Sequence, residues 1–380
     1  MKQFAFAALL ASVAAASGAQ AVDFSDAELR AILRHGPWPA PWSADPSNRA
    51  SANREAIEFG EHLFFDPRLS PSGKVLCATC HVPYRGFQDS RARAFGLAEV
   101  DRNTPSIYNV RYNRWFGWDG AGDSLWAQSI RPILESREMG GSQAQAAALL
   151  RGDAELSCRY DKTFGGPPPA SDEAVLAGIG KALAAYQETI ATGRTAFDDF
   201  RDALERGDRK SAALYPPAAQ RGLRIFVGKG DCSGCHAGPA FSSGEFRDTG
   251  VPTDISGGGA DPGRGGGIRK LQANPFNLLG RYNDDPSGSR ATRTQRVSLE
   301  QRNFGEFRVP GLRNVALTAP YMHNGSVPSL ADVVRSHPDL RRPHLSAEEA
   351  ADLVAFLESL TELPGAGVAP PKLPFAPCRR

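Results

Sequence analysis

Two pentapeptides with the same spacing limit what this chain can fold into. One is CATCH and the other is CSGCH, in a sequence of 380 residues. In each, two thiols flank two residues and a histidine follows at once, which is the attachment signal for haem c. The thiols add to the vinyl groups of the porphyrin, and the histidine then ligates the iron. The sequence therefore predicts two covalently attached haem c groups, held by Cys77, Cys80, Cys232 and Cys235 with His81 and His236 as proximal ligands.

Two other uses of these cysteines explain the motifs less completely. A single zinc site would have to join two pairs that lie far apart in the chain, unlike the compact spacing of a zinc ribbon. A pair of redox-active disulfides is the second alternative. Neither alternative gives a role to the histidine that follows each pair.

The residues before the motifs predict two related helical units. Gly60 and Phe64 precede the first motif, and Gly222 and Phe226 precede the second, each on a short amphipathic stretch. This internal similarity indicates a duplication with large insertions. The predicted fold is mainly α, with two cytochrome c-like domains that each carry one covalently bound haem, and with long loops between the helices.

The ends of the chain predict export and a closing helix. Residues 1–21 combine Lys2, an apolar run and a small-residue cleavage site, as a signal peptide does, and no later run is long enough to span a membrane. A periplasmic location is expected. Ser346 and Glu349 form a capping-box pattern at the start of the last helix. The expected segments are a signal peptide at 1–21, an N-terminal domain at 22–212 with a long helix at 171–192, a C-terminal domain at 213–362 and a Pro-rich tail at 363–380.

Beyond the motifs, the sequence resembles the bacterial di-haem cytochrome c peroxidase superfamily, which includes MauG-like enzymes. The resemblance is carried, in order, by LFFDPRLSPSGKVLCATCH, RNTPSIYNV, FGWDGAGDSLWAQSIRPILESREMG, CSGCH and FRVPGLRNVALTAPYMHNGSV. The sequence around REMG and YMHNG is most similar to that of MauG-like and MbnH-like members. The resemblance implies a haem peroxidase-type oxidoreductase whose N-terminal haem reacts with hydrogen peroxide and whose C-terminal haem transfers electrons.

The resemblance also implies roles for three side chains near the first haem. Gln128 and Glu138, with Pro132 between them, match the distal glutamine and glutamate of the family. Glu138 is the expected proton shuttle, and Gln128 is expected to hydrogen-bond peroxide. Trp118 matches the tryptophan that relays electrons between the haems. Without the resemblance, the first two would be taken as surface residues and Trp118 as a core aromatic.

One calcium ion between the domains is a further implication of the resemblance. Asn103, Thr318 and Pro320 match the calcium position. Thr318 and Pro320 would contribute backbone carbonyl oxygens, which suit a hard cation.

The sequence departs from its relatives at the sixth ligand of each iron. Peroxidases of the family that need reductive activation have a distal histidine after the first motif, but no histidine occurs between residues 82 and 235 here. The first iron is therefore expected to be open. At the second haem the family ligand lies fourteen residues past the histidine of YMHNG, where the peroxidases have methionine and MauG has tyrosine. His337 stands at that position and is predicted to ligate the iron opposite His236, with His344 as the alternative ligand.

These features predict an enzyme that uses hydrogen peroxide at the open N-terminal haem and shares oxidising equivalents with a bis-histidine C-terminal haem to oxidise a partner protein. The first alternative is a cytochrome c peroxidase that takes electrons from a small cytochrome and makes water. The second is a di-haem electron carrier without enzymatic activity. MauG has a tryptophan before its second motif, and Gly230 stands there in this chain, so the route to a protein substrate is not predicted.

Net charge, two further cysteines and His323 give three more predictions. Net charge is +2, with acidic and basic residues mixed, which does not support nucleic-acid binding. Cys158 and Cys378 are expected to form a disulfide in an oxidising compartment, with two free thiols as the alternative. His323 of YMHNG is expected to be structural. The identity of the partner, the product, the oligomeric state and the haem potentials are not predicted.

Overall fold

The computed structural model describes most of the chain after the expected leader. The described residues are 22–251, 254–255, 258–337, 344–363 and 375–378. The predicted signal peptide at 1–21 lies outside these ranges, as does most of the predicted Pro-rich tail. No helix in the described ranges is long and apolar enough to cross a membrane.

The fold class predicted from the sequence, mainly α with long loops, is confirmed. One short ladder pairs β1 (Phe246–Arg247) antiparallel with β2 (Phe307–Arg308). The α-helices in chain order are α1 (Asp26–Leu33), α2 (Arg54–Phe64), α3 (Cys77–Cys80), α4 (Leu125–Leu134), α5 (Gln143–Gly152), α6 (Ala154–Phe164), α7 (Asp172–Gln187), α8 (Ala196–Glu205), α9 (Arg209–Ala212), α10 (Pro217–Val227), α11 (Cys232–Cys235), α12 (Gly263–Ala273), α13 (Ser289–Gln295), α14 (Leu330–Ser336) and α15 (Ala347–Glu358). The 3-10 helices are η1 (Pro67–Leu69), η2 (Pro83–Arg85), η3 (Val110–Tyr112), η4 (Gln301–Asn303) and η5 (Val315–Leu317).

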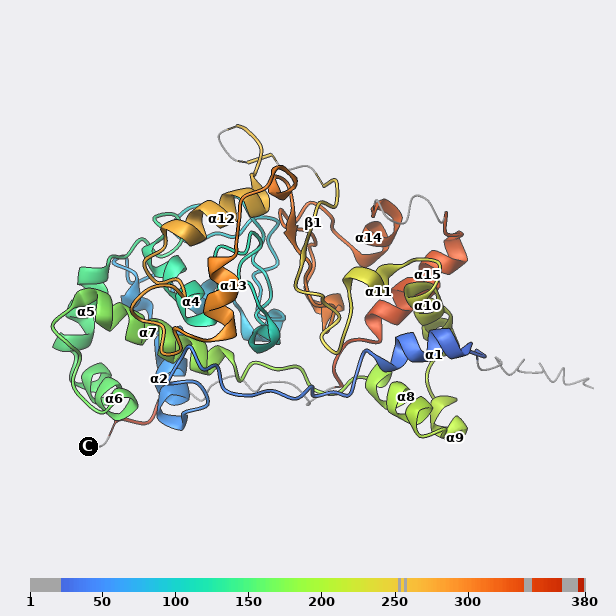
Figure 1. The fold of residues 1–380 in the computed structure, drawn as a ribbon, viewed down its shortest axis with the longest axis horizontal. Helices are drawn as coiled ribbons and strands as arrows, with labels where there is room; N and C mark the ends of the chain where they lie inside the picture. Colours follow the sequence, from blue (N-terminus) through green and yellow to red (C-terminus); the bar gives the residue numbers. More distant parts are fainter. Residues whose placement is uncertain (1–21, 252–253, 256–257, 338–343, 364–374, 379–380) are drawn as a thin grey trace, which may run out of the picture.

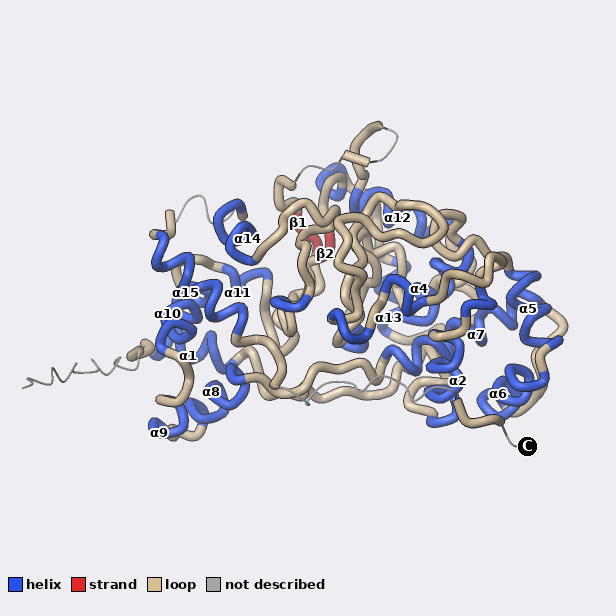
Figure 2. Tube along the Cα trace, turned by 180° about the vertical axis from the view of Figure 1, so that it is seen from behind, coloured by secondary structure: helices blue, strands red, loops and turns tan. Residues whose placement is uncertain are grey.

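The helices gather into two bodies at opposite ends of the molecule, with the β1–β2 ladder between them (Figure 1). One body contains α2, α4, α5, α6 and α7, and the other contains α8, α9, α10, α14 and α15. Extended connections run between the bodies, as the view from behind also shows (Figure 2). Each body contains one of the two motif helices, α3 or α11.

Each motif helix follows a helix that crosses a second helix at very close range. In the first body α2 crosses α7, and a Cβ added to Gly60 would lie 1.9 Å from the carbonyl oxygen of Ala182. In the second body α10 crosses α15, and a Cβ added to Gly222 would lie 1.9 Å from the carbonyl oxygen of Asp352. Only glycine allows two helix backbones to approach this closely. The two Gly-x-x-x-Phe stretches therefore mark the same helix crossing in two units.

The two hydrophobic cores do not follow the expected domain boundary between residues 212 and 213. The first core includes Leu278 and Ala291 from the second half of the chain. The second core includes Ile32 of α1 and Phe197 of α8 from the first half. Figure 1 shows this exchange, since α1 lies beside α10 while α12 and α13 lie near α4. Each body is thus completed by a segment from the other half of the chain.

The helix expected at 171–192 is shorter than predicted. It begins after Ser171, whose side chain accepts a hydrogen bond from the backbone of Ala174, and α7 ends at Gln187. The residues that follow bond to Asn109 instead of continuing the helix. Asn109 donates its backbone N–H to the carbonyl of Ile190, and its side-chain oxygen accepts from the backbone N–H of Thr192.

A disulfide joins Cys158 of α6 to Cys378 near the end of the chain, with Cα atoms 6.2 Å apart. The last described residues lie on the first body, where Phe375 packs against the ring of His62. The backbone N–H of Cys378 donates to the carboxylate of Glu155 at 2.9 Å. Residues 375–378 are therefore fixed to the N-terminal body, although the closing helix α15 belongs to the other one.

Gly222→Ala is expected to lower the free energy of unfolding by about 1–3 kcal/mol or more, because the new methyl group would overlap the backbone of α15. The measurement is guanidinium unfolding of the haem-loaded protein followed by far-ultraviolet circular dichroism. Gly152→Ala is the matched control, because nothing lies within 4 Å of a Cβ added at this end of α5. Equal losses of stability in the two variants would contradict the tight crossing.

Candidate haem and peroxide site

The first motif forms a one-turn helix, α3, and His81 caps its C-terminal end. The Nδ1 atom of His81 lies 3.1 Å from the carbonyl oxygen of Phe87. Because a carbonyl only accepts, Nδ1 is the donor, and the lone pair of Nε2 is left for a metal. Burial lowers the pKa of His81, which keeps the ring neutral as a ligand must be.

The second motif repeats this arrangement on α11. The Nδ1 atom of His236 lies 3.1 Å from the carbonyl oxygen of Phe241 and 3.2 Å from that of Pro310. Burial lowers the pKa of His236 to about 4, and the nearby His337 adds to this decrease. Both proximal histidines are thus neutral and oriented by backbone carbonyls, so each Nε2 can bind iron.

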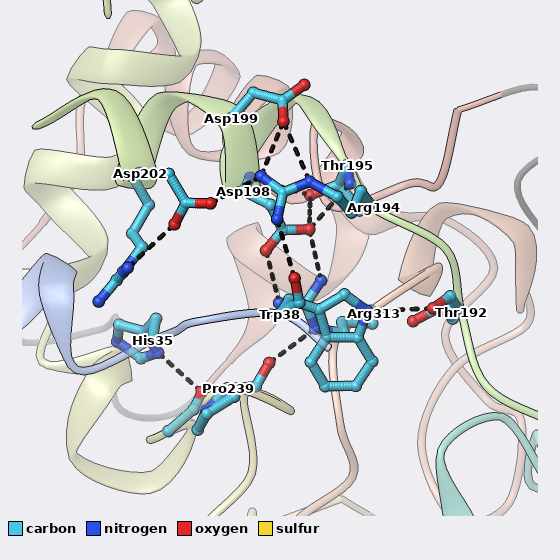
Figure 3. Close-up of polar contacts among 12 residues, drawn as sticks. His35, Trp38, Thr192, Arg194, Thr195, Asp198, Asp199, Asp202, Pro239 and Arg313 are labelled. Carbon is cyan, nitrogen blue, oxygen red and sulfur yellow. Dashed lines mark hydrogen bonds and ion pairs between the residues drawn. The ribbon is translucent and has the colours of Figure 1, made fainter. Parts of the chain in front are cut away.

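A buried ion pair between Arg313 and Asp198 supports the turn at Gly238 and Pro239, which follows His236 in the chain, and Figure 3 shows the pair. The guanidinium of Arg313 donates two hydrogen bonds to Asp198, at 2.9 and 2.8 Å, and its Nε donates to the carbonyl of Pro239 at 2.6 Å. His35, from the start of the chain, lies with Nδ1 3.1 Å from the carbonyl of Gly238. Charge-assisted bonds between buried groups are strong, so they fix the backbone that orients the proximal ligand.

A cavity of about 270 Å³ opens beside the second motif. His236 and His337 both line it, and His337 is the C-cap of α14. His344, the alternative ligand, is exposed. Other residues that line the cavity are Cys232, Cys235, Phe226, Leu330, Val333, Val334, Leu353 and Leu357. The arrangement brings the predicted axial pair and the attachment cysteines to one apolar cavity.

A buried arginine in the same cavity lacks a carboxylate partner among the described residues. Arg308 donates from Nε to the carbonyl of Gly117 at 3.3 Å, and burial lowers its pKa to about 10. An isolated buried charge is costly unless a counter-ion neutralises it. The propionates of a haem supply such counter-ions. The four motif cysteines are not joined in disulfides, and together with the oriented histidines and Arg308 they fit haem c.

The predicted peroxide-side residues lie on α4 and on the turn that follows it. Gln128 is on α4, about one turn after the start of the helix, and Glu138 is on the turn that follows α4. Burial raises the pKa of Glu138, and the neighbouring Arg131 opposes that increase. Burial also raises the pKa of Cys80 to about 12, with the carboxylate of Glu138 among the smaller causes. Glu138 is therefore close enough to the first motif to act electrostatically on its thiols.

Trp118 lies where the two bodies meet. Its indole nitrogen donates to the carbonyl of Asn103 at 2.9 Å, and its own carbonyl accepts from the backbone N–H of Arg308 at 2.8 Å. Trp118 lines the same cavity as His236. The position is compatible with the predicted relay role.

The three predicted calcium ligands also line this cavity. Asn103 donates its side-chain N–H to the carbonyl of Arg91 at 2.7 Å, so its amide oxygen is the atom available to a cation. Pro320 follows a cis peptide bond after Ala319. Oxygen donors from Asn103, Thr318 and Pro320 would suit calcium, and the calcium site stays a prediction.

His323 is buried, as expected for a structural residue. Its ring stacks on Phe307 with centroids 3.6 Å apart, and burial lowers its pKa to about 4. Its backbone carbonyl accepts from Asn103 at 2.8 Å, which ties the YMHNG turn to the other body.

Sequence reasoning missed several arginines that complete the site. Arg313 and Arg308 act through long-range contacts that have no local pattern. Arg131 carried a local signal, because it lies three residues after Gln128 on the same helix and residues so spaced share a face.

Taken together, the fold and the two motifs define a c-type cytochrome with two haem-binding units. The comparisons with known proteins agree. The family model for di-haem cytochrome c peroxidase matches residues 54–206, and one for RoxA-like, cytochrome c-like proteins matches 307–344.

Relatives match almost the whole chain. The methylamine utilization protein MauG of Methylorubrum extorquens is 33% identical over 97% of this chain and 94% of its own length. The cytochrome c551 peroxidase of Nitrosomonas europaea is 30% identical, over 81% of this chain and 80% of its own. The solved structure of a MauG-like protein associated with microbial copper homeostasis is similar with a TM-score of 0.62 and 27% identity, over 86% of this chain and 96% of the other.

The chain belongs to the di-haem cytochrome c peroxidase family. It is a haem peroxidase-type oxidoreductase with covalently bound haem c, as the sequence predicted. Its relatives include proteins named MauG and proteins named cytochrome c peroxidase.

His337→Ala is expected to change the low-spin haem signal of the oxidised protein and to leave the high-spin signal unchanged, because His337 is the predicted ligand of the second iron only. Electron paramagnetic resonance of the as-isolated protein measures both signals. His344→Ala is the matched control, since that side chain is exposed. A low-spin signal that survives in His337→Ala and is lost in His344→Ala would assign the ligand to His344.

Proposed function

We propose that this protein uses hydrogen peroxide at the N-terminal haem and shares the oxidising equivalents with the C-terminal haem to oxidise a partner protein. The observation that carries the proposal is a first motif with Glu138 close enough to act on its thiols and no histidine between residues 82 and 235, and Gln128 lies on the helix before Glu138. An iron without a sixth protein ligand accepts peroxide without prior reduction. The haem supplies the redox chemistry, and the pocket around it decides which reaction occurs.

The side chains at the first haem handle the protons of peroxide. Glu138 would take a proton from one oxygen of peroxide and return it to the other oxygen, as a general base and then a general acid. Gln128 donates a hydrogen bond to peroxide and holds it in the orientation needed for that transfer. His81, oriented by the carbonyl of Phe87, would hold the haem iron.

The second unit has a different task in this proposal. His236 and His337 line one cavity with the attachment cysteines, which supports coordination from both faces. Two imidazole ligands lack the thioether sulfur that raises the potential of a haem. A lower potential favours sharing oxidising equivalents over waiting in the reduced state to split peroxide. Trp118 lies between the bodies, where a relay between the haems would run.

The same proposal includes a cellular location, a partner and a bound ion. The attached haem and the Cys158–Cys378 disulfide both suit an oxidising compartment outside the cytoplasm, which supports the proposed periplasmic location. The partner is a protein, with an aromatic side chain as the expected target. One calcium ion at Asn103, Thr318 and Pro320 is proposed to hold the two bodies together.

The second candidate is a cytochrome c peroxidase that makes water with electrons from a small cytochrome. It is favoured by the similarity to a relative that is named cytochrome c551 peroxidase. The two candidates differ in their need for a reductant.

Stopped-flow absorption of the oxidised protein, mixed with hydrogen peroxide and no reductant, separates the candidates. A rapid change at the high-spin haem, with little turnover when a reduced small cytochrome is added, is expected for the proposed function. Reaction only after prior reduction, followed by fast cytochrome oxidation, would identify a peroxidase. Two low-spin haems that do not react would leave an electron carrier.

Glu138→Gln is expected to slow the reaction with peroxide by about 10²–10⁴-fold, the usual contribution of a general acid–base group. The wild-type rate is also expected to fall as the pH falls through the raised pKa of Glu138, because the protonated carboxyl cannot accept a proton. Rates measured from pH 4 to 9 give both results. Glu135→Gln, on the exposed face of the same turn, is the control and should keep the wild-type rate. An unchanged rate in Glu138→Gln would contradict its role as proton shuttle.

A further inference from the structure

Arg131 contacts the side chain that is proposed to bind peroxide. It lies three residues after Gln128 on α4, and its Nη1 atom is 3.0 Å from Oε1 of Gln128. Residues at this spacing share one face of a helix, so the contact follows directly from the local structure. A charged donor makes this bond stronger than one between neutral groups.

This contact determines which end of the Gln128 amide points away from Arg131 and can meet a ligand. A guanidinium donates hydrogen bonds and accepts none, so the atom next to Arg131 is the amide oxygen. The NH2 group of Gln128 is therefore the end that remains to meet a ligand. Without Arg131 the amide could turn over and present its oxygen, which repels the lone pairs of peroxide.

The loop that carries Trp118 packs against the contact between Gln128 and Arg131. A Cβ added to Gly117 would lie 3.5 Å from both Oε1 of Gln128 and Nη1 of Arg131. A Cβ added to Gly122 would lie 3.0 Å from Oε1 of Gln128. Two glycines thus allow the loop to pack closely against the amide oxygen and its arginine partner, which limits the movement of both side chains.

Arg131 also places a positive charge near Glu138. The charged groups around this carboxyl are Arg131 from α4, Lys270 from α12, and Glu135 and Arg137 from its own turn. Among the cations, Arg131 has the largest effect on the pKa of Glu138. It therefore favours the ionised carboxylate that burial alone would disfavour.

We propose that Arg131 is a positioning residue of the peroxide site, which orients Gln128 as a hydrogen-bond donor. This inference rests on the proposed function. In the step concerned, an O–H bond of hydrogen peroxide breaks and the proton goes to a carboxylate oxygen of Glu138. The electron pair stays on the hydroperoxide anion, whose charge the NH2 group of Gln128 stabilises.

Cyanide is a suitable probe, because hydrogen cyanide also loses a proton when its anion binds an open ferric haem. The test measures the rate of cyanide binding to the oxidised, haem-loaded protein from pH 5 to 9. Arg131→Leu is expected to lower the plateau rate at high pH on the order of tenfold, the effect of losing one charge-assisted hydrogen bond. The acid limb of the profile is expected to move to higher pH, because Glu138 loses its main cationic neighbour.

Arg137→Leu is the matched control for charge. Arg137 belongs to the turn of Glu138 but donates to Asp101 and makes no bond to Gln128. Its removal is expected to move the acid limb slightly and to leave the plateau unchanged. Arg131→Lys keeps the charge near Glu138, so its acid limb should stay close to that of the wild type even where the plateau falls. Haem content and circular dichroism verify that each variant is folded.

A double-mutant cycle with Gln128→Ala separates this inference from the proposed function. The plateau of Arg131→Leu with Gln128→Ala should equal that of Gln128→Ala alone, because Arg131 acts on the plateau through the amide. A slow Gln128→Ala variant with a wild-type plateau in Arg131→Leu would overturn the inference and leave the proposed function intact. A wild-type plateau in Gln128→Ala would instead remove Gln128 from the proposed site. Effects that add in the double variant would also overturn the inference.

Discussion

The structure depends on two helix crossings that only glycine permits. At Gly60 and at Gly222 the backbone of one helix lies against a carbonyl of another, with no room for a side chain. The motif helix is the next α-helix after each crossing helix, so the crossing helps to set where the cysteines and the proximal histidine lie relative to the core. A larger residue would separate the helices and displace the haem site with them. The same constraint in both bodies explains why the duplicated stretches keep Gly-x-x-x-Phe.

The two bodies also depend on each other, because each core contains segments from both halves of the chain. α1 and α8 complete the core around the second motif, while the segment that contains α12 and α13 packs on the first body. Asp123 helps to hold this segment on the first body. One of its carboxylate oxygens accepts a hydrogen bond from the backbone N–H of Leu278 at 2.8 Å and another from the hydroxyl of Thr294 at 2.9 Å. Because each core needs residues from both halves, we expect the halves to fold together and not as separable domains.

Features with a local origin could be predicted from the sequence. The motifs, the crossing glycines, the cap at Ser346 and the mainly α fold all depend on residues close together in the chain. The exchange of segments between the cores could not be predicted, because long-range packing of apolar residues leaves no periodic signal that names its partner. Arg313 illustrates the limit, since its partner Asp198 lies far away in sequence and nothing near either residue indicates the pair.

The two units share one local arrangement of loop, cap and helix, although their proposed roles differ. Ser124 caps α4 and Ser329 caps α14, and an antiparallel bridge closes the loop before each cap, Phe116 with Gly122 and Tyr321 with Val327. Eight residues after the cap stands Pro132 in the first unit and His337 in the second. Proline has no donor or metal-binding atom in its side chain, whereas imidazole is a strong haem ligand. On the proposed assignment, the helix after the cap supplies a ligand to the second haem through His337, whereas Pro132 supplies none at the equivalent place in the first unit.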